Sequence, residues 1–205
     1  LVIFLQRRED TPSLFLACFC GAIALRQWLT GLLAQEMGMA HSLAGFELHV
    51  RLEYLTMPLI GMSAGLFIHA LVPGRLFKRC VDIWYVGFGL VLIGFSVLAS
   101  TLVISGTAYL YQVHVLGACI FILIYLCREA VEGHVVARWV AMAFLVLFAG
   151  TVNDVLVVNS VIPGVFIAPY TFIVFILIQS GILSGKIAYA FRRAEHLGVN
   201  LQREV

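Results

Sequence analysis

Long apolar runs separated by short polar connections make up most of this chain. The runs that contain no Asp, Glu, Lys or Arg are residues 54–74, 83–127 and 155–185. Two further runs contain one charged residue each, Arg26 in residues 11–31 and Asp154 in residues 139–160. About 20 apolar residues in an α-helix cross the ~30 Å of hydrocarbon in a bilayer. Because these runs lack the alternation of membrane strands, they predict membrane-spanning helices.

The run lengths and the turn residues between them place six complete spans. The predicted spans are residues 13–33, 51–72, 83–104, 107–127, 139–160 and 167–187. A further apolar stub at residues 1–5 is too short to cross, so we expect the chain to be cut inside a preceding helix. The predicted fold is therefore all-α, a polytopic transmembrane bundle with seven helices in the intact domain.

Composition excludes the common soluble classes. Hydrophobic residues make up 62% of the 205 residues and charged residues only 12%, whereas soluble domains are about half apolar and about a quarter charged. The sequence contains no phosphate-binding loop, nucleophile elbow or zinc-protease pattern. We therefore expect no enzymatic activity, no catalytic residue, no cofactor or metal, and no nucleic-acid partner for this chain.

Basic residues predict which ends of the spans face the cytoplasm. Of the 13 Lys and Arg residues, only Arg26 and Arg51 fall on one side of the predicted bundle. The other eleven fall on the side that also holds the C-terminus: Arg7, Arg8, Arg75, Lys78, Arg79, Arg128, Arg138, Lys186, Arg192, Arg193 and Arg203. Connections rich in Lys and Arg stay inside the cell. The C-terminus is therefore predicted to be cytoplasmic.

Several polar residues lie at similar depth near the predicted outer ends of the spans. They are Arg26, Glu53, His114, Asn153 and Asp154. Ionisable groups inside a membrane are costly and usually face the interior of the bundle. Two interpretations remain open, a network that fixes helix packing and an outward-facing ligand or switch site. Both require an acidic partner for Arg26, because an unpaired buried guanidinium is very unfavourable.

A second group of polar residues lies where the second complete span begins. In a helix, Glu47 and Arg51 are four residues apart and can form an ion pair, as can His49 and Glu53. A metal site made of His41, His49 and Glu53 is conceivable, but their spacing matches no specific ligand pattern.

The chain remains helical in pattern after the last span. Apolar or small residues recur at alternating spacings of four and three, and they form a candidate output seam: Ile187, Phe191, Ala194, Gly198, Leu201 and Val205. This is the spacing of a coiled-coil seam and predicts a parallel homodimer. We accordingly divide the chain into a sensor-type membrane domain at 1–186 and a linker helix at 187–205. An amphipathic helix resting on the membrane surface is the alternative.

Three segments carry a resemblance to a known family. The first opens with Arg51-Leu52-Glu53-Tyr54-Leu55-Thr56 and closes with Leu71-Val72-Pro73. The second is Val152-Asn153-Asp154-Val155-Leu156, and the third runs from Phe172 to Ser180 and on to Ala190-Phe191. These segments resemble the third, sixth and seventh helices of the bacterial seven-transmembrane receptors with diverse intracellular signalling modules.

The resemblance implies a function for the chain. It implies the transmembrane part of a receptor in the bacterial inner membrane, with an extracytoplasmic sensor domain before it and an output module such as a histidine kinase or cyclic-nucleotide enzyme after it. The alternative is a small-solute transporter or channel subunit, for which the inner halves of the spans offer little polar lining. A passive membrane anchor is the third possibility.

Overall fold

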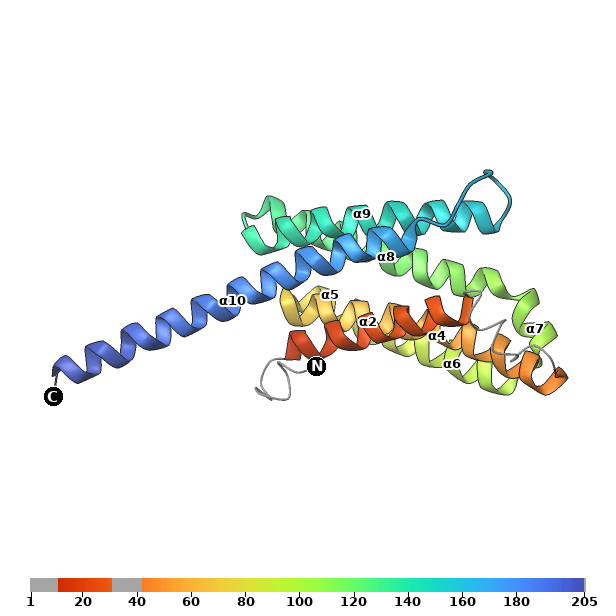
Figure 1. Cartoon of the computed structure of the whole chain (residues 1–205), viewed down its shortest axis with the longest axis horizontal. Coiled ribbons are helices and arrows are strands. Elements are labelled where there is room, and N and C mark those ends of the chain that lie inside the picture. Colours follow the sequence, from red (N-terminus) through yellow and green to blue (C-terminus); the bar gives the residue numbers. More distant parts are fainter. Residues whose placement is uncertain (1–10, 31–41, 205) are drawn as a thin grey trace.

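The structure, a computed structural model, describes residues 11–30 and 42–204, and this part of the chain is a bundle of long helices (Figure 1). In chain order the helices are α2 Thr11–Thr30, α4 Leu43–Leu71, α5 Arg75–Cys80, the π-helix η1 Val81–Phe88, α6 Gly89–Leu98, α7 Thr101–Gly106, α8 Ala108–Val131, α9 Val135–Val158 and α10 Ala168–Glu204. Residues 11–30 and 42–204 include no strand. The all-α fold class is confirmed.

Six helical stretches among the described residues are long and apolar enough to cross a membrane. They are Thr11–Thr30, Leu43–Leu71, Arg75–Leu98, Ala108–Val131, Val135–Val158 and Ala168–Gly185. The third stretch joins α5, η1 and α6 without a break. The prediction of six complete spans in a multi-pass membrane protein is therefore confirmed, whereas the stub at residues 1–5 lies outside the described residues.

The boundaries of the third span were predicted wrongly. The sequence placed this span at 83–104, but the helical stretch runs from Arg75 to Leu98. The first turn of this stretch carries Arg75, Lys78 and Arg79, and all three side chains are exposed. Long cationic side chains can extend toward the membrane surface, so the backbone that carries them can continue the helix. The chain breaks twice between the third and fourth spans. Ala99 and Ser100 are extended with ψ of 158° and 152°, residues 101–106 form α7, and a turn at Thr107, where the sequence predicted the fourth span to begin, leads into α8.

Helix α4 occupies the centre of the bundle. Half of its apolar window is buried, compared with 22–28% for the other five spans. It packs against α2, α8, η1 and α6. Helix α9 packs against α8, and α10 packs against α9 and contacts α2. Because α4 contacts helices on several sides, groups that it carries can reach several neighbouring spans.

An aromatic cluster joins four of the helices. The ring of Phe175 in α10 makes edge contacts with Phe19 of α2, Phe67 of α4 and Phe144 of α9, at centroid distances of 5.8, 6.5 and 6.1 Å. Phe175 and Phe67 are fully buried. Edge-to-face aromatic pairs add about 0.5–1.5 kcal/mol each beyond the area they bury. The last span is therefore held firmly against the rest of the bundle.

The two ends of the bundle differ. One end carries the α8–α9 connection and the beginning of α2, and α10 extends far beyond it (Figure 1). We call this the tail end. The opposite end carries the connections at 99–107 and 159–167, and we call it the far end. The positions of the predicted polar residues are given below relative to these two ends.

Candidate functional site

Arg26 and Glu53 meet at the far end of the bundle. The Arg26 Nη2 atom lies 3.9 Å from Glu53 Oε1, and Nη1 donates to the Glu53 carbonyl oxygen at 3.2 Å and to Thr56 Oγ1 at 3.5 Å. Both charged side chains are partly buried, at 24% and 32% exposed. Glu53 is the acidic partner that the sequence required for Arg26. The contact ties the last turns of α2 to the central helix α4.

Asp154 and Asn153 organise the start of the last span. The Asp154 Oδ1 atom accepts hydrogen bonds from the backbone N–H of Ile167 at 2.8 Å and of Ala168 at 3.3 Å, and Oδ2 accepts from Ala168 at 3.2 Å. Asn153 Nδ2 donates to the Val165 carbonyl at 3.0 Å and to Asp154 Oδ1 at 3.1 Å. A carboxylate is favourable at a helix N-terminus because free N–H groups and the helix dipole converge there. The pair therefore couples α9 to the beginning of α10.

His114 lies on α8, fully buried between neighbouring helices. Neither of its ring nitrogens has a hydrogen-bond partner. Gly61 of α4 leaves room for its ring, because a Cβ added there would lie 2.9 Å from Nε2. Gly89 of α6 also borders the ring, since a Cβ there would make ordinary contact with Nε2 at 3.8 Å. The rings of Trp84 and Phe88 cover it at centroid distances of 6.2 and 5.4 Å. The imidazole is therefore enclosed by apolar and backbone groups.

The five predicted polar residues thus occupy three separate places. Arg26 pairs with Glu53, Asn153 and Asp154 bind the start of α10, and His114 is buried between α4, α6 and α8. The interactions of the described residues do not join these places into one cluster. What they share is that each one connects two or more spans.

Arg51 contributes a further link that the sequence assigned differently. Its Nη1 atom donates to the carbonyl oxygens of Ser96 at 3.1 Å and Val97 at 2.6 Å, at the end of α6. Cations are favourable there because the last carbonyls of a helix lack partners. The expected pair of Arg51 with Glu47 is therefore replaced by a bond between spans. The signal available in the sequence was an arginine at the first position of a predicted span.

Gln179 of α10 is a second fully buried polar side chain without a hydrogen-bond partner. Both its amide atoms, Oε1 and Nε2, are unpaired. It follows Phe175 by one helical turn and so lies on the same face of α10. A single glutamine within an apolar run was visible in the sequence, but nothing there indicated that it faces the core.

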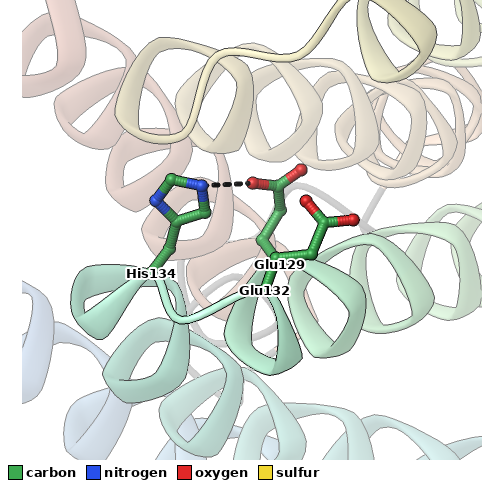
Figure 2. A group of neighbouring side chains, drawn as sticks. All are labelled: Glu129, Glu132 and His134. Atoms are coloured by element: carbon green, nitrogen blue, oxygen red, sulfur yellow. Dashed lines mark ion pairs between the residues drawn. The ribbon is translucent and has the colours of Figure 1, made fainter.

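Charged residues also gather at the tail end, in the α8–α9 connection (Figure 2). Glu129, Glu132 and His134 each offer one ligand atom, and these atoms lie within 4.8 Å of one another. Each carboxylate already has a basic partner, with Arg128 Nε 2.9 Å from Glu132 Oε1 and His134 Nε2 3.4 Å from Glu129 Oε2. The tight connection that holds them passes through Gly133, whose φ of +98° favours glycine. These pairs explain the arrangement without an ion.

The candidate output seam belongs to α10, which continues as a helix to Glu204. The side chains of Ile187, Phe191, Ala194 and Leu201, and all of Val205, lie outside the described residues. The backbone establishes that the last span and the segment after it are one uninterrupted helix, as the sequence pattern predicted.

Comparison with known proteins identifies the family. The sequence model of the family described as 7TM diverse intracellular signalling matches residues 1–188. The chain belongs to this family. No curated protein matches it, and no solved structure does.

Membership of the 7TM diverse intracellular signalling family agrees with the architecture. The matched region covers all six spans and ends where α10 leaves the bundle. The resemblance inferred from the sequence is therefore confirmed, and the chain is a membrane signalling domain of a receptor. Helices of this length and composition place it in a lipid bilayer as a multi-pass protein.

Proposed function

We propose that this domain carries a signal from outside the cell to an output module attached after α10. In this scheme the far end faces the extracytoplasmic side and the tail end faces the cytoplasm of a bacterium. The positive-inside distribution of Lys and Arg supports this orientation, since Arg75, Lys78, Arg79 and Arg138 are exposed at the tail end. The chain itself has no catalytic role in this proposal.

The continuity of α10 is the observation that carries the proposal. This helix begins at the far end, where Asp154 binds its first N–H groups, crosses the bundle and continues beyond the tail end (Figure 1). A change in the 159–167 connection would therefore act directly on a helix whose other end lies outside the membrane. A ligand or sensor domain can shift two states of such a bundle only through differential binding to them.

The linker helix completes the proposed route. Residues 187–205 form a parallel coiled coil with a second copy of the chain, so that motion of the last span becomes a rotation or register shift of a dimer. The output module that follows is a histidine kinase or a cyclic-nucleotide enzyme, in keeping with the family's diverse signalling partners.

Substitution of Asp154 by Asn tests this route. The variant keeps an oxygen acceptor for Ile167 N–H but removes the charge at the start of α10. We expect changed output from the full-length receptor, with unchanged membrane insertion measured by reporter fusions. Unchanged output and ligand response would contradict the proposal, and solute flux through the domain in proteoliposomes would favour a transporter instead.

A further inference from the structure

Two unpaired buried groups face one another within the membrane. His114 is fully buried and neither of its nitrogens has a partner, and the indole Nε1 of Trp84 is likewise buried without a partner. Their rings are stacked, with centroids 6.2 Å apart and an interplanar angle of 28°. A hydrocarbon environment offers no water to satisfy such groups, so each carries a substantial cost as it stands.

The two groups are chemically complementary. The indole nitrogen can only donate a hydrogen bond, whereas a neutral imidazole has one acceptor nitrogen and one donor nitrogen. The stacked arrangement prevents their bond, because N–H groups and acceptor lone pairs lie in the planes of their rings. A modest tilt or slide of Trp84 would bring the donor toward the acceptor.

Trp84 is carried by the element best suited to such a movement. It lies within the π-helix η1, Val81–Phe88. π-helical turns are rare, occur mainly as local bulges inside α-helices and are frequent at functional sites. Each π turn holds one residue more between bonded groups than an α turn, so local rewinding can reposition a side chain without breaking the helix.

The absence of a side chain at Gly117 of α8 lets the indole of Trp84 pack close to that helix. A Cβ added at Gly117 would lie 3.1 Å from Cζ2 and 3.4 Å from Nε1, and the rings of Phe121 and His114 on α8 lie at centroid distances of 6.3 and 6.2 Å from the indole. The neighbouring Tyr85 is fixed, since its hydroxyl donates to the Ala118 carbonyl at 2.6 Å. Tyr85 therefore fixes η1 directly beside Trp84, and the indole lies over Gly117, a position of α8 that carries no side chain.

We propose that Trp84 and His114 form a two-state latch. In the state described here the rings are stacked and unbonded, and in the second state the indole N–H donates to the acceptor nitrogen of His114 as η1 rewinds. This inference deepens the proposed relay by naming the element that moves between the two states of the bundle.

The latch can be tested without any ligand or output module. The full chain is placed in lipid nanodiscs with tryptophan labelled at the indole nitrogen, and chemical-exchange NMR is recorded. The chain has three tryptophans, and the Trp84→Phe variant assigns the resonance of interest. We expect Trp84 to exchange with a minor, downfield resonance of order 0.1–10% population, typical of a minor state. The absence of exchange at Trp84 would overturn the latch.

Substitutions at His114 identify the acceptor. His114→Leu should abolish the minor resonance, and His114→Gln, which retains an acceptor, should preserve it. Phe88→Leu is the matched control, since Phe88 contacts both rings but accepts no such bond, and it should leave the exchange in place. Persistence of the minor resonance in His114→Leu would overturn the proposal. If the His114→Leu variant does not fold, the ring nitrogens of His114 are measured in the unsubstituted chain instead. They should exchange at the same rate and with the same minor population as Trp84, and the absence of such exchange would refute the latch.

The outcome is independent of the relay. A static Trp84 would remove the latch while leaving the Asp154→Asn test of signal transfer unaffected. Conversely, unchanged signalling in Asp154→Asn would remove the relay even if the latch exists.

Discussion

Single polar residues in this bundle act mainly as connectors between spans. Arg26 joins α2 to α4, Arg51 joins α4 to the end of α6, and Asp154 joins α9 to the start of α10. In each case a charged group bonds to backbone atoms of a neighbouring element: the Glu53 carbonyl within α4, the last carbonyls of α6, and the first N–H groups of α10. Backbone groups at helix ends need such partners, and the need is stronger where water is scarce.

The Arg26–Glu53 pair gives a stability prediction. Glu53→Gln removes the counter-charge but leaves the Glu53 carbonyl and Thr56 as acceptors for Arg26. We expect a loss of about 1 kcal/mol, because the pair is only partly buried and part of the bonding survives. Thermal unfolding in detergent should show a lower midpoint. Glu47→Gln, at an exposed position on the same helix, serves as the control, and an equal effect there would contradict the assignment.

The role of a polar residue could be predicted from the sequence where its partner is another charged side chain, and could not where its partners are backbone groups. The pairing of Arg26 with an acid followed from its burial in an apolar run and the similar depth of Glu53. The role of Asp154 could not be predicted, because its partners are the N–H groups of residues 167 and 168, which come near only through the path of the 159–167 connection. Equal depth alone does not determine which spans are neighbours.

Whole helices were more predictable than their ends. Apolar runs must be helical to satisfy their backbone in lipid, and this requirement gave the six spans. The charged residues between 75 and 82 favour a connection in the sequence, and the third span was therefore predicted to start at 83 instead of Arg75. The π-helical winding of residues 81–88 left no trace in the sequence. Residues 81–88 contact α4 and α8, and such contacts between distant segments are not contained in a one-dimensional pattern.

The contact between α9 and α10 gives a prediction at the scale of helices. A Cβ added at Gly150 of α9 would overlap the side chain of Thr171 on α10. Gly150→Ala should therefore destabilise the domain by about 1–3 kcal/mol, the usual cost of overpacking, and lower the midpoint of thermal unfolding.

Gly94 of α6 provides the matched control for this substitution. A Cβ at Gly94 meets nothing within 4 Å, so Gly94→Ala should leave stability unchanged or raise it, since alanine favours a helix. Equal destabilisation by the two variants would show that the α9–α10 contact is not the cause.

The orientation of the entire domain can be checked by labelling single cysteines. In a background without the five native cysteines, Lys78→Cys and Val161→Cys place thiols at exposed positions at the tail end and far end. We expect a membrane-impermeant maleimide to label position 161 in intact spheroplasts and position 78 only after lysis. The reverse pattern would invert the proposed direction of signalling.

Assembly of two copies makes a separate prediction for the whole receptor. In the same background, Ala194→Cys lies on the predicted seam and Arg193→Cys lies beside it. Oxidation should cross-link the first variant into dimers several-fold faster than the second. Equal rates would favour a helix lying on the membrane surface, and no cross-linking would favour a monomer.

The length of α10 has a mechanical consequence. Its 37 residues extend about 56 Å at 1.5 Å per residue, and roughly half of that length lies past the lipid. The contacts of Phe175 and Asp154 hold the part of α10 inside the bundle. A tilt of only about five degrees at the membrane boundary would therefore move the distal tip by about 2 Å over that free half. In the proposed relay, α10 would thus act as a lever arm, in which a small change of angle at the membrane boundary becomes a larger displacement at the distal tip.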